Sequence, residues 1–192
     1  MKKLISLTLS AALCLGLFAG CGKQSAPVTT ETTAPAYASS LEVLEKVWAT
    51  FPEEDRFPAA GGDEAHDTTD GPGAFDINAY GESFRYQTLV DENLTGKLTG
   101  DAATLIHMMN TNTFCSAVME LKNAGEASSF AEVYKEIVQG NHWMCGFPDT
   151  LVVLSLGNFV LTAYGADDLI QLFKNGAQSL GATLLVEAPA EA

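Results

Sequence analysis

The chain has 192 residues, of which 47% are hydrophobic, and its 10 Lys and Arg residues against 24 Asp and Glu residues give a formal net charge of −14. A surface this acidic repels nucleic acid and anionic lipid headgroups, so the composition excludes a nucleic-acid partner and a basic membrane-binding patch. The length and apolar content are enough for one packed domain.

The N-terminus has the pattern of an export signal. A basic Met1–Lys3 segment precedes an apolar run over 4–18, which is shorter than the roughly 20 residues that a transmembrane helix needs. Small residues then lead into Cys21, and this arrangement resembles the lipobox of bacterial lipoproteins. The resemblance implies a signal peptide at 1–20, cleavage before Cys21, and a lipid on the Cys21 thiol that holds the protein on the outer face of the cell membrane.

Composition divides the rest of the chain into three parts. Residues 21–38 are mostly Lys, Gln, Ser, Thr, Pro and Ala, which is typical of a flexible tether. Residues 39–187 are expected to form a single extracytoplasmic domain, and 188–192 a disordered tail. Loss of Lys2 and Lys3 with the signal would leave 8 basic residues against 24 acidic ones, a net charge of −16.

The first element of the domain is a predicted helix over 41–51. Ser39 and Glu42 have the spacing of a capping box, and apolar residues then recur at helical intervals. The segment from Pro52 to Phe75 is rich in acidic residues and in proline and glycine, which interrupt helices and strands. This indicates a long loop of the kind that is often functional. The segment 76–98 is ambiguous between a short helix and an irregular strand.

The second half alternates strands and helices. Two strands are predicted at 104–109 and 114–122, although the first run could also begin as a helix from Asp101. A helix begins at Ser128 or Ser129, carries the strongest apolar periodicity of the chain and ends at Gly140.

A β-hairpin is predicted from the strand-forming runs 151–156 and 159–164, which flank Gly157 and Asn158. A helix from Asp167 and a short edge strand at 182–186 complete the domain. These elements predict an α+β fold, with an antiparallel sheet of about four to five strands and helices packed on one face.

Two cysteines, Cys115 and Cys145, remain after the signal and Cys21 are set aside. A disulfide is possible between them in an oxidising compartment, and two buried free thiols are the alternative. The segment Trp143–Pro148 resembles the Trp-Cys-Gly-Pro-Cys site of thioredoxin-like proteins, but Pro148 occupies the place of the second cysteine.

The loop between Pro52 and Phe75 contains the candidate ligands of the chain. The acids Asp63, Glu64, Asp67 and Asp70 surround His66 and supply the oxygen donors that calcium prefers, but their spacing does not match a calcium loop. The three histidines lack a zinc-site spacing. No metal, cofactor or catalytic residue is therefore predicted, because no nucleophile elbow or phosphate loop is present either.

Three segments, 57–63, 107–114 and 143–149, resemble a group of small, largely uncharacterised lipoproteins of anaerobic gut bacteria. Some members carry the label "bacteriocin transport accessory protein". The resemblance covers the chain from about Leu41 to the last helix, and it implies an extracytoplasmic lipoprotein without implying any catalytic residue.

The sequence favours a tethered binding or interaction module over an enzyme. Its candidate surface combines the acidic loop, namely Asp63, Glu64, His66, Asp67 and Asp70, with the aromatic residues Trp143 and Phe147. The partner would be an unknown protein or small molecule. The alternatives are a thiol-redox or peptide-export accessory protein and, last, a ligand-binding lipoprotein that serves a transporter.

Overall fold

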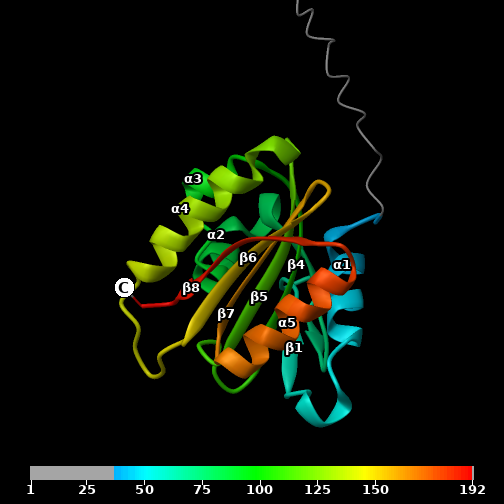
Figure 1. Cartoon of the computed structure of the whole chain (residues 1–192). Helices are drawn as coiled ribbons and strands as arrows, with labels where there is room; N and C mark the ends of the chain where they lie inside the picture. The colour runs from blue at the N-terminus through cyan, green and yellow to red at the C-terminus, as the bar shows by residue number, and fades with distance from the viewer. Residues whose placement is uncertain (1–36, 192) are drawn as a thin grey trace, which may run out of the picture. The chain divides into compact units, whose positions relative to one another are not determined.

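The structure, a computed structural model, describes residues 37–191, so the predicted signal peptide, Cys21 and most of the predicted tether lie outside the described residues. One antiparallel sheet forms the centre of this region, with α1 and α5 against one face and α2, α3 and α4 against the other (Figure 1). Within 37–191, no helix combines the length and the apolar character that crossing a bilayer requires.

The sheet has eight strands in the order β2-β1-β4-β5-β7-β6-β8, and β3 also pairs with β4. Their bounds are β1 Ala59–Gly61, β2 Thr68–Thr69, β3 Gly73–Asp76, β4 Leu98–His107, β5 Phe114–Leu121, β6 Thr150–Leu156, β7 Phe159–Gly165 and β8 Thr183–Pro189. The long central strands β4, β5, β7 and β6 carry most of the core, whereas β2 and β8 are the edges.

Five α-helices cover the sheet: α1 Ser40–Ala49, α2 Ile77–Thr88, α3 Glu92–Thr95, α4 Ala127–Gln139 and α5 Asp167–Ser179. Single turns of 3-10 helix occur at Glu53–Asp55 and Ala124–Glu126. Helix α1 begins as predicted, because the Ser39 hydroxyl accepts a hydrogen bond from Glu42 N at 3.2 Å. The Glu42 carboxylate in turn accepts one from Ala38 N at 2.8 Å.

The α+β class is confirmed, but the prediction of helices on one face is wrong. Alternate residues of β5 enter two separate cores, with Cys115 and Met119 on the α2–α4 side and Phe114 and Val118 on the α1–α5 side. An antiparallel sheet that is apolar on both faces can be kept from water only by helices on both. The strand count is also higher than the predicted four to five, because the segment 59–76 adds three short strands.

The segment 52–75 is therefore not the long free loop that its breakers suggested. Strand β1 pairs with the outer edge of β4 at His107 and Ile106, and β3 pairs with the next stretch of the same edge. The chain can change partners there because Gly61 and Gly73 lie backbone to backbone, and a Cβ on either would overlap the other residue. Glycine at these positions allows a close approach of two strands.

The remaining elements agree closely with the sequence. Strand β5, helix α4, the Gly157–Asn158 hairpin and helix α5 form where they were predicted, whereas β4 begins earlier than predicted, at Leu98, and ends at His107, so that Met108 and Met109 lie in the turn and not in the strand. The ambiguous segment contains α2 and α3, and the alternative of a helix from Asp101 is wrong because β4 includes that residue. Strand β8 continues through Pro189, and the buried Ala190 donates its N–H to Asp149 O, so the ordered domain extends beyond residue 187.

Candidate functional site

Asp63 is a buried structural residue and not an exposed ligand. Its side chain is 0% exposed, and its Oδ1 accepts hydrogen bonds from Ala65 N, His66 N and His66 Nδ1 at 2.8 to 3.0 Å. Its Oδ2 accepts one from Asp76 N at 2.8 Å. Burial by itself would raise the pKa of Asp63, but these hydrogen bonds outweigh burial and hold the pKa below its ordinary value. Asp63 therefore anchors the β1–β2 segment to β3.

The other loop residues of the predicted surface, Glu64, His66, Asp67 and Asp70, are exposed. His66 is oriented by its contact with Asp63, and Asp70 adopts a left-handed backbone with φ of 66°. In the part of the chain that the structure describes, no group of three or more His, Cys, Asp and Glu side chains is placed to hold a metal ion.

Cys115 and Cys145 are both free, and they have opposite environments. Cys115 lies on β5 in the core, where its thiol donates to Gln87 O at 3.1 Å, and burial raises its pKa to about 12. Cys145 lies in the exposed connection between α4 and β6, and its φ of 63° is left-handed. The possible disulfide is therefore not formed in this structure, because one thiol faces the core and the other the solvent.

The C-terminal end of α2 packs against the core that contains Cys115. The carbonyl of Gln87 accepts from Cys115 and from the Tyr164 hydroxyl at 3.2 Å, and the carbonyl of Thr88 accepts from the Tyr134 hydroxyl at 3.0 Å. Carbonyls in the last turn of a helix lack partners within the helix, so these side chains supply them. Burial raises the pKa of both tyrosines, which keeps their hydroxyls protonated as donors.

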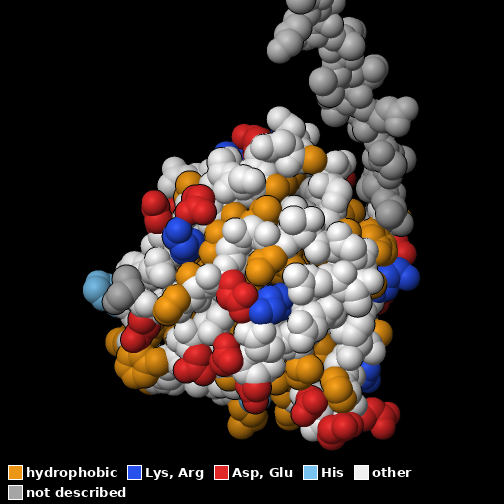
Figure 2. All heavy atoms as spheres, viewed as in Figure 1, with side chains coloured by type: hydrophobic (Ala, Val, Ile, Leu, Met, Phe, Trp, Pro, Cys, Tyr) orange, Lys and Arg blue, Asp and Glu red, His pale blue; other side chains and the backbone are white. Residues whose placement is uncertain are grey.

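Exposed apolar side chains gather at one end of the sheet. Within 37–191, five large hydrophobic side chains are exposed, and four of them come from the β4–β5 turn and the α4–β6 connection: Met108 at 47%, Met109 at 78%, Met144 at 78% and Phe147 at 68%. We call these four residues the turn-end surface. Hydrophobic side chains lie beside acidic ones along this end of the molecule (Figure 2).

Two asparagines of the turn join these segments. Asn110 Nδ2 donates to Cys145 O at 3.0 Å, and Asn112 Nδ2 donates to Met144 O and Gly146 O at 3.1 and 3.0 Å. Cys145 and Gly146 have φ of 63° and 144°, and these hydrogen bonds brace that unusual backbone. The turn-end surface is thus held in shape before any partner arrives.

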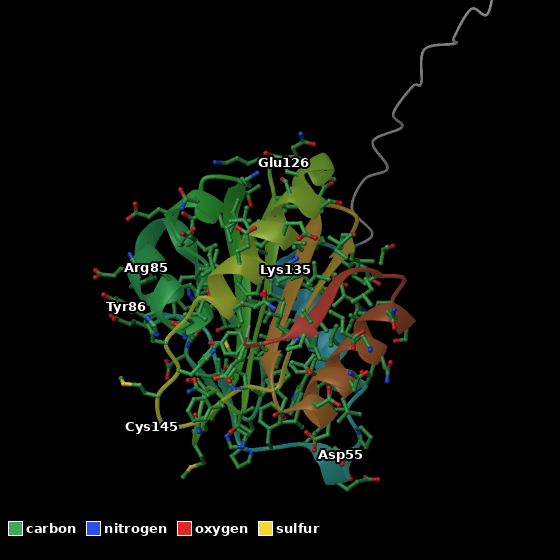
Figure 3. The ribbon with its side chains drawn as sticks, turned by 60° about the vertical axis from the view of Figure 1, so that its left-hand side comes forward. Asp55, Arg85, Tyr86, Glu126, Lys135 and Cys145 are labelled. Atoms are coloured by element: carbon green, nitrogen blue, oxygen red, sulfur yellow. The ribbon has the colours of Figure 1, made fainter. Side chains whose placement is uncertain are left out.

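Acidic residues lie at the same end of the molecule as the turn-end surface. Asp149 N bonds Gly165 O at 2.9 Å and Ala166 N bonds Thr113 O at 2.8 Å, so the start of β6 and the start of α5 lie at the same end as the β4–β5 turn. This places Asp149, Asp167 and Asp168 there. Figure 3 shows Asp55, from the acidic turn Glu53–Asp55, at the same end as Cys145.

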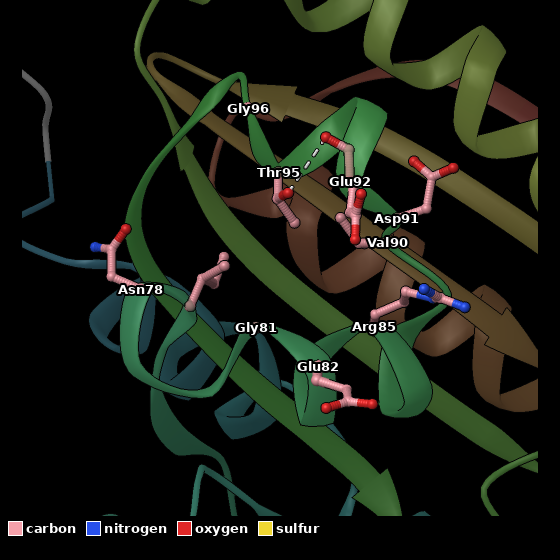
Figure 4. Close-up of a pocket in the computed structure, with 10 residues that line it drawn as sticks. Asn78, Gly81, Glu82, Arg85, Val90, Asp91, Glu92, Thr95 and Gly96 are labelled. Carbon is pink, nitrogen blue, oxygen red and sulfur yellow. Dashed lines mark hydrogen bonds between the residues drawn. The ribbon is translucent and has the colours of Figure 1, made fainter.

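A groove runs between α2 and α3. Its cavity of about 530 Å³ is lined by apolar Ile77 and Val90 and by charged Glu82, Arg85, Asp91 and Glu92. A second hollow continues from Arg85 past Tyr86 to Ile137 and Asn141. In Figure 4, Glu82 and Arg85 project from α2, and the Glu92 side chain extends from α3 toward α2.

The predicted surface is thus divided by the structure. Phe147 is exposed, whereas Trp143 is half-buried with its ring centroid 5.2 Å from that of Tyr164, so Trp143 anchors the segment. No hydrogen bond or ion pair among residues 37–191 joins the acidic loop to this segment. Met108, Met109 and Met144 were not predicted as surface residues of the site. They lie in 107–114 and 143–149, two of the segments that resemble the lipoprotein group, and hydrogen bonds join these two segments.

Comparison of the chain with protein-family models, with curated proteins and with solved structures finds no match.

Proposed function

We propose that the protein is a lipid-anchored module outside the cell membrane that binds a protein partner through the turn-end surface. The observation that carries the proposal is that four of the five exposed large hydrophobic side chains between residues 37 and 191 gather there. The two segments that carry them are joined by the hydrogen bonds of Asn110 and Asn112. Exposed apolar side chains on neighbouring segments are typical of interaction sites, and methionines adapt to the shape of a partner.

Charge indicates the chemistry of the partner. The acids at the same end as the turn-end surface favour a segment that presents apolar side chains flanked by Lys or Arg, because opposite charges steer association and like charges oppose it. A second copy of this chain would bring two acidic ends together, and an anionic lipid surface would be repelled. We therefore propose a basic, apolar protein segment as the occupant.

The described chain begins at the end of the domain opposite the turn-end surface. The described chain begins near Leu180 O, which accepts from the Tyr37 hydroxyl, and near Asp101, which accepts from Ser40 N at 2.7 Å. Both lie at the far end of α5 and β4 from the turn-end surface. The described residues before α1 therefore do not cover the turn-end surface.

Photo-crosslinking in the bacterium that makes the protein tests the binding site. A photoactivatable residue would replace Met144 in one strain and exposed Asn175 of α5 in a control strain. The proposal predicts a discrete adduct from position 144, with a basic apolar segment at the joined site, and none from position 175. Identical patterns from both positions, or no adduct from 144, would contradict it.

The lipid anchor has a separate test. Metabolic labelling with an alkyne fatty acid should tag the full chain, and Cys21→Ser should abolish the label and release the protein from the membrane fraction. Label retained by Cys21→Ser, or absent from the unchanged chain, would refute the anchor without bearing on the turn-end surface.

The thiol-redox alternative has weaker support. Thiol exchange proceeds through a thiolate, and a Cys115 thiol with a pKa of about 12 is protonated at neutral pH. Cys145→Ser provides the test, because a redox accessory protein would lose its cellular function with that change.

A further inference from the structure

We propose that the groove between α2 and α3 is a binding site for a basic amino acid, that is, an α-amino acid that carries a second cationic group. The site is separate from the turn-end surface and does not depend on the function proposed above. The cavity of about 530 Å³ lies within the usual range of roughly 300 to 1,000 Å³ for small-molecule pockets.

Three of the four charged side chains of the groove, those of Glu82, Arg85 and Glu92, are exposed and have no ion-pair partner among residues 37–191. Glu82 and Glu92 make no side-chain hydrogen bond or ion pair between residues 37 and 191, and Arg85 has no carboxylate within ion-pair distance. Elsewhere Lys46, Lys97, Lys135 and Lys174 each pair with a glutamate. The guanidinium of Arg85 lies 5.6 Å from the centre of the Tyr86 ring, a contact that orients it without neutralising its charge.

The balance of charges selects the ligand. Among the charged residues that line the groove, Arg85 is basic and Glu82, Asp91 and Glu92 are acidic, so the lining has a formal charge of −2. Asp91 already accepts hydrogen bonds from Asn93 N and Leu94 N as the cap of α3, which leaves the two glutamates to receive new donors. A ligand with one carboxylate and two cationic groups offers one group of opposite charge to each of Arg85, Glu82 and Glu92.

The apolar residues of the groove lie where the aliphatic part of such a ligand would run. Ile77 and Val90 are buried apolar side chains that line the cavity between the charged walls. Val90 is 0% exposed and Ile77 8%, so the aliphatic stem of lysine, ornithine or arginine would cross the groove beside Ile77 while its ends reach the charges. A neutral or acidic amino acid would leave at least one glutamate unpaired.

Titration of the mature chain, carrying Cys21→Ser to keep it in solution, tests the proposal with four probes: L-lysine, its decarboxylated analogue cadaverine, L-leucine and L-glutamate. Backbone amide NMR shifts report both the affinity and the place of binding. L-lysine should bind about tenfold more tightly than cadaverine or L-leucine, since each charge-assisted hydrogen bond contributes about that factor, and L-glutamate should not bind. The shifts should fall within 77–96.

Single variants identify the contacts. Arg85→Gln should weaken L-lysine about tenfold and leave cadaverine unchanged, because only L-lysine offers a carboxylate. Glu92→Gln should weaken both, and the control Glu136→Gln, an exposed acid of α4, should weaken neither. The proposal is overturned if L-lysine does not bind, if its shifts lie outside the groove, or if Arg85→Gln affects the two probes equally.

Discussion

Replacement of Asp63 by Asn tests whether this residue anchors the β1–β2 segment. The change keeps the size of the side chain but removes the charge, and its amide can present only one carbonyl oxygen to four donors. Asp76 N or the Ala65 and His66 donors would then lose an acceptor. Hydrogen bonds to a charged group contribute about 1.5 to 3 kcal/mol each, and part of this cluster is open to water, so we expect a loss of about 2 to 4 kcal/mol.

The loss should depend on pH in a defined direction. The pKa of Asp63 is lower in the folded state than in the unfolded chain, where it is about 3.9. The carboxylate therefore stabilises the fold fully above that value, and this contribution is lost as the pH falls through the folded pKa. The free energy of unfolding of the unchanged protein should exceed that of Asp63→Asn most at pH 7, and the gap should shrink below about pH 4.

Urea unfolding followed by far-ultraviolet circular dichroism measures both quantities, and Asp67→Asn is the matched control. Asp67 lies in the same segment, is exposed and makes no side-chain hydrogen bond or ion pair within 37–191, so its change should stay within about 0.5 kcal/mol. An Asp63→Asn variant as stable as the control, or a gap that widens on acidification, would refute the anchoring role.

Three further outcomes follow from the site. Tyr134→Phe should lower the free energy of unfolding in urea by about 1 to 3 kcal/mol, because the buried carbonyl of Thr88 loses its donor; an unchanged midpoint would argue against this bond. Asn112→Ala should speed amide hydrogen exchange in 141–149 while leaving exchange in β5 unchanged, since only the connection loses hydrogen bonds; equal acceleration in both would contradict local bracing. In the mature chain carrying Cys21→Ser, maleimide should modify Cys145 alone in the native state and reach Cys115 only after unfolding; two labels, or none, in the native state would conflict with the structure.

Local sequence signals predicted the elements that depend on local interactions. The cap at Ser39, the apolar stripe of α4 and the Gly157–Asn158 turn each act within a few residues, so their patterns determine the structure without knowledge of the rest of the fold. The α+β class follows from these elements.

The layers could not be predicted from periodicity alone. The run Leu151–Leu154 is apolar at every position, which is typical of a strand buried on both faces and is the signal that could have indicated helices on both sides. The three short strands within 52–75 could not be predicted from the sequence. Glycines such as Gly61 and Gly73 occur both in free loops and where two strands approach closely, so their presence does not distinguish the two structures.

Only part of the candidate site could be predicted, because it too depends on contacts between distant segments. Phe147 was correctly placed at the surface, but whether an apolar residue faces out depends on contacts between segments that are distant in the sequence. The segments that carry Met109 and Met144 are joined by Asn110 and Asn112, which bond residues more than thirty positions away. Asp63 was assigned to the surface by charge, and only its four donors explain its burial.

The proposed function requires the turn-end surface to recognise an apolar segment flanked by basic residues. The most direct test is an NMR titration of the mature Cys21→Ser chain with two designed amphipathic peptides that share the same apolar residues, one flanked by Lys and the other by Glu. We expect saturable shifts in 108–112 and 142–149 with the basic peptide, with binding weakened by added salt, and no shifts with the acidic peptide. Equal binding of both peptides, or shifts confined to other surfaces, would contradict it.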